Sequence, residues 1–101
     1  MNEYFLSLGF YIITAYCCVG IGGGFCGQTA SGAQVGPGTI AADPRLLPFG
    51  TRLFIPGYGD GIVQDTGGAI RGQRLDVFYP DCSDAWQWGR RLVPVYLREE
   101  E

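Results

Sequence analysis

Glycine and proline recur so often along this chain that only short segments of regular structure fit between them. The 101 residues include 17 glycines and 6 prolines, and few stretches show the period of an amphipathic helix. Glycine adopts the positive φ angles of tight turns without steric cost, and proline cannot donate a hydrogen bond inside a sheet. The pattern predicts an all-β fold of short strands. A chain of this length has room for one modest core, so residues 1–101 are expected to form a single domain.

The apolar runs between these turn residues predict six strands. They are expected at residues 10–16, 39–42, 51–55, 61–64, 74–79 and 92–97. The segment between the first two, residues 20–37, reads as a long loop. In the fifth strand the period-2 alternation places Leu75, Val77 and Tyr79 on one face and Asp76 and Phe78 on the other.

One short helix is predicted near the C-terminus. Ser83 or Asp84 can cap its first turn, and Gly89 can end it after Trp88. Trp86 and Trp88 lie two residues apart and therefore face different ways on a helix. We expect Trp88 to lie in the core and leave a ligand-stacking role open for Trp86.

The charged residues exclude several classes of function. Seven basic residues, all arginine, stand against ten acidic ones, so no cationic face is available for phosphates and nucleic acid is not an expected partner. The chain has neither histidine nor lysine, which removes imidazole-based catalysis and Schiff-base chemistry. If the protein is an enzyme, carboxylates must transfer the protons. No cofactor and no metal site are expected.

The four cysteines leave the disulfide pattern open. Cys17, Cys18, Cys26 and Cys82 allow three complete pairings, and the sequence cannot choose among them. They lack the paired C-x-x-C spacing of a zinc site. A bond between Cys17 and Cys26 is the favoured disulfide, and buried free thiols are the alternative.

The uncharged stretch at residues 4–24 could be mistaken for a signal peptide or a membrane span. Its flank carries Glu3 but no basic residue, glycines interrupt the apolar run, and no A-x-A-like cleavage site stands out. We therefore expect a buried strand in this segment, with no membrane span and no clear signal peptide.

Three aspartates are candidates for chemistry, although each has an ordinary structural explanation. Asp76 lies inside a predicted strand, where an aspartate opposes β-propensity, but it could be half-exposed and paired with an arginine. Asp65 opens a glycine-rich turn and could bond that turn's own amides. Asp43 precedes a proline and could be a turn residue.

Five segments together resemble the three-aspartate, or 3D, domain of lytic transglycosylases and of bacterial stationary-phase survival and resuscitation proteins. In order they are ITAYC (13–17), TASG (29–32), IAADPRLLPFGTRLFI (40–55), QDTGGAIRG (64–72) and RLDVFY (74–79). The resemblance implies a six-stranded double-psi β-barrel whose aspartates surround a glycan groove. The family's three aspartates fall on Asp43, Asp65 and Asp76, with Asp76 as the catalytic acid and base and the other two supporting it.

The same resemblance implies how such a domain would act on peptidoglycan glycan strands. Asp76 would protonate the oxygen between N-acetylmuramic acid and N-acetylglucosamine, and then act as base on the 6-hydroxyl to close a 1,6-anhydro ring. A neighbouring acidic group would raise the pKa of Asp76 and keep its proton available. Positions that match the flanks of the groove, and are expected to contact substrate, are Tyr16, Thr29, Thr66, Gly67, Gly68 and Arg71.

Two other functions remain as alternatives. A non-catalytic glycan-binding barrel would share the fold, because fold alone does not confer activity. The triplet Asp65-Thr66-Gly67 also occurs in retroviral-type aspartic proteases, but those have most of the subunit after the triplet, unlike this chain. A peptidoglycan substrate implies action in the cell envelope or outside the cell, as an excised domain or a phage-type lysin. The oligomeric state is not predicted.

Overall fold

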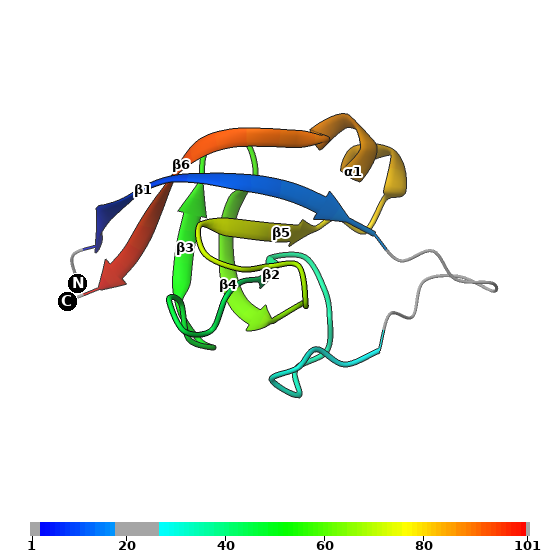
Figure 1. The fold of residues 1–101 in the computed structure, drawn as a ribbon, viewed down its shortest axis with the longest axis horizontal. Coiled ribbons are helices and arrows are strands. Elements are labelled where there is room, and N and C mark those ends of the chain that lie inside the picture. Colours follow the sequence, from blue (N-terminus) through cyan, green and yellow to red (C-terminus); the bar gives the residue numbers. More distant parts are fainter. Residues whose placement is uncertain (1–2, 18–26, 101) are drawn as a thin grey trace.

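The computed structural model describes residues 3–17 and 27–100, and they form a closed barrel of six strands (Figure 1). The strands and the helix are β1 (Glu3–Tyr16), β2 (Thr39–Ala41), β3 (Arg52–Ile55), β4 (Gly59–Asp65), β5 (Arg74–Phe78), α1 (Cys82–Trp88) and β6 (Arg90–Glu100). Around the barrel the order is β1-β5-β2-β4-β3-β6. The predicted all-β barrel with six strands and one short C-terminal helix is confirmed.

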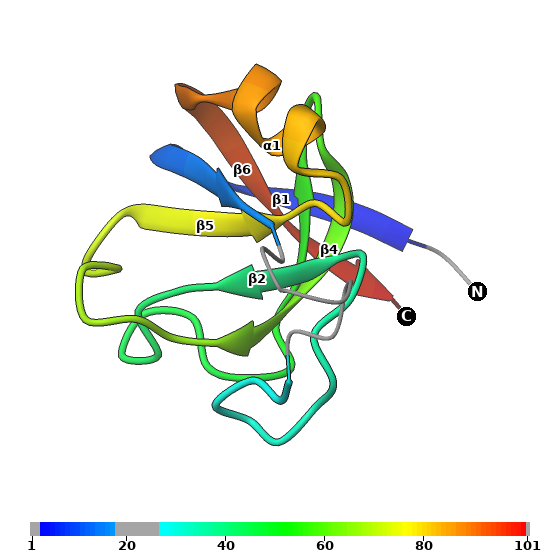
Figure 2. The ribbon, with the colours of Figure 1, turned by 90° about the vertical axis from the view of Figure 1, so that its right-hand side faces the viewer.

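The order of strands around the barrel differs from their order in the chain. Strands β1 and β5 pair in parallel, and so do β2 and β4, whereas β2 pairs with β5 in antiparallel fashion. Parallel neighbours cannot be joined by a tight turn, so each pair requires a crossover connection. Figure 2 shows β2 lying between β5 and β4, away from its neighbours in sequence.

Side chains that point into the barrel form one core. All six strands contribute to it, through the fully buried Ile13, Ile40, Leu53, Ile55, Val63, Leu75, Val77 and Val95. Trp88 closes the core from α1, and its indole nitrogen donates to the Ile13 carbonyl oxygen at 3.0 Å. The prediction that Trp88 is a core residue is confirmed, whereas Trp86 is 80% exposed.

Strands β1 and β6 are longer than predicted. Their backbones pair in antiparallel register from Glu3 opposite Glu100 to Thr14 opposite Arg90, with a bulge between Ser7 and Phe10. The two ends of the described chain therefore lie side by side, as Figure 1 shows. Residues 4–16 of the segment expected to contain a buried strand belong to β1, in which Tyr11 and Ile13 are buried, whereas Phe5, Leu6 and Phe10 are exposed. Residues 18–24 of that segment lie outside the described residues. In residues 3–17 and 27–100, no helix is both long and apolar enough to span a membrane.

The cap of α1 differs from the prediction. The helix begins at Cys82, and its N-cap is Asp81, which lies two residues before Ser83 and three before Asp84. The Asp81 carboxylate accepts hydrogen bonds from the Ser83 amide at 2.8 Å and from the Ser83 hydroxyl at 2.9 Å. Asp81 caps a helix as well as Ser83 or Asp84 would, and it lies where the helical backbone begins, so it takes this role. The predicted end at Gly89 is confirmed, since that residue is the C-cap with φ 66°.

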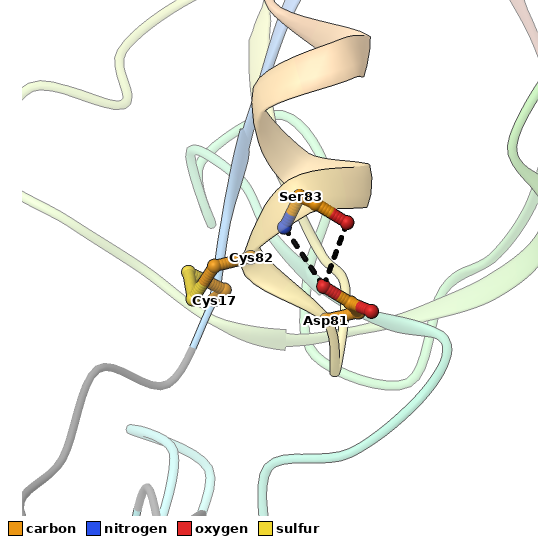
Figure 3. The surroundings of a disulfide bond; sticks show 4 residues. All are labelled: Cys17, Asp81, Cys82 and Ser83. Carbon is orange, nitrogen blue, oxygen red and sulfur yellow. Dashed lines mark hydrogen bonds between the residues drawn. A yellow bond between two sulfur atoms is a disulfide. The ribbon is translucent and has the colours of Figure 1, made fainter.

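The favoured disulfide was wrong. Cys17 bonds to Cys82, with a Cα–Cα distance of 5.1 Å and a sequence separation of 65, rather than to Cys26 (Figure 3). The bond connects the residue after β1 to the first residue of α1. The register of β1 and β5 explains the pairing, because Tyr16 lies opposite Phe78 and brings both cysteines to the same end of the barrel. Cys18 and Cys26 lie outside the described residues.

Candidate functional site

A row of four residues crosses the outer face of four neighbouring strands. Thr14 of β1 pairs with Asp76 of β5, Asp76 pairs with Ala41 of β2, and Ala41 pairs with Asp65 of β4. Paired residues of adjacent strands project to the same face of a sheet, so the two aspartates flank Ala41. Ala41 contributes only a methyl group between them and is itself buried. The sheet thus brings Asp65 and Asp76 together.

Both aspartates of this pair are half-buried, and Asp76 is the one whose pKa is raised. Burial raises the pKa of its carboxyl above the ordinary value, and the negative charge of Asp65 raises it further. The Thr14 hydroxyl donates to Asp76 Oδ1 at 3.1 Å and, with the positive charge of Arg74, opposes this rise. A carboxyl with a raised pKa holds its proton to higher pH than an ordinary aspartate, as a general acid requires.

Thr14 is a site residue that the sequence analysis missed. Its hydroxyl is the side-chain donor to the Asp76 carboxylate, 62 residues away in sequence. The signal was present in the segment 13–17, where Thr14 and Tyr16 share the face opposite to Ile13. Its target could be identified only once the parallel register of β1 and β5 was known.

Asp65 ties two loops to the end of β4. Its Oδ1 accepts hydrogen bonds from the Ala30 amide at 3.0 Å and from the Thr66 amide at 2.9 Å. The Ser31 amide adds a bond to the Gln64 carbonyl oxygen at 3.1 Å. Asp65 therefore holds both the TASG turn and the start of the Thr66-Gly67-Gly68 turn beside the aspartate row.

Asp43 is separate from this pair and is 2% exposed. Its Oδ1 accepts from the Arg45 amide and from Arg45 Nε, both at 3.0 Å. Its Oδ2 accepts from Arg45 Nη2 at 2.8 Å and from the Gly72 amide at 3.0 Å. The hydrogen bonds from Arg45 and Gly72 hold the pKa of Asp43 well below its usual range. Asp43 thus joins the turn after β2 to the turn that leads into β5.

Replacing Asp43 with asparagine is expected to destabilise the fold at neutral pH. Asparagine replaces one carboxylate oxygen with an NH₂ group. That group cannot accept a hydrogen bond, so at least one of the N–H groups of Arg45 and Gly72 would lose its acceptor. Because the pKa of Asp43 is lowered in the folded state, its stabilising contribution is present above the unfolded value of 3.8 and is lost as pH falls towards the folded value. The difference in Tm between parent and variant should therefore shrink from neutral pH to about pH 2.

Asp60→Asn is the matched control for this measurement. Asp60 also forms an ion pair, with Arg98 at 2.7 Å, but its side chain is 57% exposed. Exposed ion pairs contribute little to stability, so this change should barely alter Tm. A Tm difference for Asp43→Asn that stayed constant over the whole pH range would contradict the role assigned to the Asp43 charge.

Tyr16 lies at the end of β1, next to the aspartate pair. Its ring packs edge-on against Phe78 with centroids 5.4 Å apart. Its hydroxyl is buried and has no hydrogen-bond partner among residues 3–17 and 27–100. Burial, followed by the charges of Asp65 and Asp76, raises the pKa of this phenol, so it remains a protonated donor. Within the described residues it is thus a buried donor without a partner, next to two carboxylates.

The other predicted contact residues occupy two loops. Thr29 is buried, and its hydroxyl bonds Ser31 Oγ at 3.0 Å and donates to the Ala33 carbonyl oxygen at 2.9 Å, so it shapes the TASG turn. Thr66, Gly68 and Arg71 are exposed, and Gly67 is half-buried. Arg71 Nε donates to the Gly68 carbonyl oxygen at 3.3 Å, which folds its side chain back over its own turn. Substrate contact by these residues remains a prediction.

Two hollows on the surface lie next to this row rather than on it. One of about 220 Å³ contains Gln64, the neighbour of Asp65, and the other of about 330 Å³ contains Phe78, two residues after Asp76. The segment Pro37-Gly38 contributes to both. Neither hollow is lined by Asp65 or Asp76. Within the described ranges, no cluster of three acidic or cysteine side chains could hold a metal ion.

Comparisons with known proteins identify similar sequences. Residues 38–98 match the 3D domain family, a segment that includes all three aspartates. The cell wall-binding protein YocH of Bacillus subtilis (strain 168) is 40% identical over 87 residues. That alignment covers 82% of this chain and 30% of YocH, so the chain spans less than a third of this relative. The resemblance inferred from the five segments is confirmed.

Solved structures share the barrel. E. coli MltA with bound chitohexaose superposes with a TM-score of 0.60 at 22% identity, over 71% of this chain and 27% of that one. The lytic transglycosylase LtgG of Burkholderia pseudomallei gives a TM-score of 0.58 at 26% identity, over 72% of this chain and 27% of that one. At such identities the likeness shows the fold, and the predicted double-psi topology is confirmed.

Proposed function

The chain belongs to the 3D domain family, and from that premise we propose that it binds peptidoglycan and cleaves its glycan strands as a lytic transglycosylase. The observation that carries the proposal is the half-buried Asp76, whose pKa is raised, beside Asp65 on an outer face of the barrel. The lytic transglycosylase LtgG, which shares the fold, supports the same reaction class. The protein would act in the cell envelope or outside the cell, where this substrate lies.

In the first step Asp76 acts as a general acid. Its carboxyl proton passes to the glycosidic oxygen between N-acetylmuramic acid and N-acetylglucosamine, and the C–O bond breaks with the electron pair on the departing oxygen. The anomeric carbon develops oxocarbenium character. Burial and the Asp65 charge favour the protonated form of Asp76 before the reaction, and the Thr14 hydroxyl stabilises the carboxylate that remains afterwards.

In the second step the same carboxylate acts as a base. It takes the proton of the 6-hydroxyl of the muramic acid residue, and that oxygen attacks the anomeric carbon to form the 1,6-anhydro ring. The proton count is restored and no water is consumed. One catalytic carboxyl group therefore suffices, which agrees with the separation of Asp43 from the pair.

The surrounding residues have supporting roles in this proposal. Asp65 raises the pKa of Asp76 and positions the TASG and Thr66-Gly67-Gly68 loops, whose backbone would face the sugar. The Tyr16 hydroxyl would donate to a substrate oxygen. Asp43 is a positioning residue, because its carboxylate bonds Arg45 and Gly72 and so fixes the turn before β5.

The reaction products test the proposal. Purified peptidoglycan should be digested with the protein and the soluble muropeptides examined by mass spectrometry. Ends in 1,6-anhydro-N-acetylmuramic acid are the expected result. Reducing ends would show hydrolysis and overturn the ring-closing step, and an absence of soluble products under conditions where the protein sediments with the wall would overturn the enzymatic function.

That last outcome would support the second candidate function, a glycan-binding barrel without catalysis. The observation in its favour is the 40% identity to a protein named for cell wall binding. The two functions differ in turnover, since a binding module would be retained by peptidoglycan without releasing anhydro ends.

Replacing Thr14 with valine is expected to shift the pH dependence of cleavage. The Thr14 hydroxyl lowers the pKa of Asp76 by bonding its charged form, so its loss raises that pKa. The acid step requires protonated Asp76, and activity falls as pH rises through the pKa of Asp76. The alkaline limb of the pH profile should therefore move to higher pH in Thr14→Val.

Thr51→Val provides a matched control for this shift. The Thr51 hydroxyl donates to the Pro48 carbonyl oxygen and lies outside the aspartate row. The control should keep the parent pH profile. An alkaline limb in Thr14→Val that stayed in place or moved to lower pH would contradict the assigned role, whatever the change in total activity.

A further inference from the structure

Two buried polar side-chain atoms have no hydrogen-bond partner in residues 3–17 and 27–100. They are the Tyr16 hydroxyl oxygen and Arg74 Nε. A buried polar group without a partner destabilises a fold, so such atoms are rare and each requires an explanation. Tyr16 has a proposed contact with substrate, whereas Arg74 has no role in the mechanism so far. Arg74 is therefore the polar group of this region that remains to be explained.

Arg74 lies beside Asp76 on the outer face of β5. The two residues are two positions apart in an extended strand, so their side chains project to the same face at a spacing of about 7 Å. Leu75 between them points into the core and is buried. The register with β1 places Ile12 opposite Arg74 and Thr14 opposite Asp76. The positive charge of Arg74 is close enough to act on the Asp76 carboxyl and to lower its pKa.

The other groups that face Asp76 come from β1, β2 and β4. Asp65 of β4 is negative and raises the pKa of the Asp76 carboxyl. Tyr16 of β1 has a raised pKa and stays neutral, and β2 contributes only the methyl group of Ala41. In the part of the chain that the structure describes, Arg74 is thus the cation whose charge opposes that of Asp65 at this carboxyl.

Proton transfer would change what the Asp76 carboxyl requires from its neighbours. Within the described ranges the Thr14 hydroxyl is the one donor to this group, and it reaches Oδ1 at 3.1 Å. A carboxylate accepts further hydrogen bonds on both oxygens, and the planar fork of a guanidinium suits that geometry. An ion pair that strengthens as the proton leaves stabilises the transition state more than the ground state, and so increases the rate.

We propose that Arg74 is a positioning residue, whose guanidinium pairs with the carboxylate that Asp76 becomes after proton transfer and holds it for the ring-closing step. The inference rests on the proposed function and adds a residue to it. The pair forms as the proton of Asp76 passes to the glycosidic oxygen. It separates when Asp76 takes the proton of the 6-hydroxyl, and Arg74 stays charged throughout.

The kinetics of Arg74→Gln test this pairing. Without the cation the charge on Asp76 is less stable, so kcat for the release of anhydro ends is expected to fall about tenfold. KM should stay unchanged, because no substrate contact is lost. The alkaline limb of the pH profile should move to higher pH, since the Asp76 carboxyl keeps its proton longer. Arg74→Lys retains the charge and should restore the position of the limb.

Arg98→Gln is the matched control for the loss of one positive charge. Arg98 lies opposite Phe5, nine residues along β1 from Thr14, and forms its ion pair with the exposed Asp60. Its removal should leave the pH profile in place. If Arg74→Gln does not fold, Arg74→Met replaces it, because methionine keeps the apolar stem of arginine and removes only the charged group.

A carboxyl titration separates the inference from the proposed function. The ¹³C signal of the Asp76 carboxyl reports its pKa in the protein without substrate. That pKa should be higher in Arg74→Gln than in the parent, and equal to the parent value in Arg98→Gln. An unchanged Asp76 pKa and pH profile in Arg74→Gln would overturn the pairing, and cleavage by the parent would leave the proposed function standing. A parent that releases no anhydro ends, although its Asp76 pKa depends on Arg74, would overturn the proposed function and leave the pairing in place.

Discussion

Asp76→Asn is expected to lose the formation of 1,6-anhydro ends, with a fall in rate of about 10²–10⁴-fold. Asparagine has nearly the same shape, and its carbonyl oxygen can still accept the hydrogen bond from Thr14, but it has no proton of the required acidity to give to the glycosidic oxygen. Both proposed steps use this one group, so removing it affects each of them. The measurement is the yield of anhydro ends from purified peptidoglycan over time.

The Tm of Asp76→Asn shows whether a loss of activity comes from the missing acid group or from unfolding of the variant. The pKa of Asp76 is raised in the folded state, so the folded protein favours the protonated carboxyl, and this contribution is lost as pH rises through the folded pKa. At neutral pH the ionised group is therefore unfavourable to folding, and Asp76→Asn should have a Tm no lower than the parent.

Asp84→Asn is the control for the loss of one negative charge. Asp84 is exposed in the first turn of α1, on another part of the surface. It should retain the activity of the parent. A folded Asp76→Asn variant that still released anhydro ends at the parent rate would remove Asp76 from the mechanism.

Loss of the Cys17–Cys82 disulfide is expected to give the largest decrease in stability. The bond joins residues separated by 65 positions and so closes a loop that contains all three aspartates. Opening a loop of this length releases conformational entropy in the unfolded chain worth about 4 kcal/mol. The double variant Cys17→Ser/Cys82→Ser should show this decrease in a denaturant unfolding experiment, with a lower midpoint and a somewhat steeper slope, because the unfolded chain without the bond exposes more surface.

The double variant is preferable to either single one, because a remaining cysteine could pair with Cys18 or Cys26. Reduction of the parent protein provides an independent comparison. Parent protein in a reducing agent should approach the stability of the double variant measured in the same reducing agent. Equal unfolding midpoints for oxidised and reduced parent would show that the bond contributes no stability.

The elements of the barrel could be predicted from sequence because each depends on local pattern. Alternating apolar residues marked β5, and the glycine after Trp88 marked the end of α1. Pairing could not be predicted in this way. The register that places Tyr16 opposite Phe78 joins segments more than 60 residues apart and leaves no local signal. This is why the favoured partner of Cys17 was the nearby Cys26 and not Cys82.

The candidate site was predictable to the same extent. The motifs identified Asp43, Asp65 and Asp76, but a motif does not show which way a side chain faces. Only the folded chain shows Asp43 directed at Arg45 and Gly72, while Asp65 and Asp76 lie across Ala41 from each other. Thr14 was missed for a related reason, because its hydrogen-bond partner is distant in sequence.

The pairing of Glu3 with Glu100 has a consequence for how such a domain can be combined with others. Two chain ends that leave a barrel at the same point can be spliced into a surface loop of a host protein without stretching either one. Asp65 and Asp76 are carried by β4 and β5 with β2 between them, whereas the paired ends of β1 and β6 lie beyond the bulge between Ser7 and Phe10, away from Thr14. Insertion of the domain through these two ends would therefore leave the connections of β2, β4 and β5 unchanged.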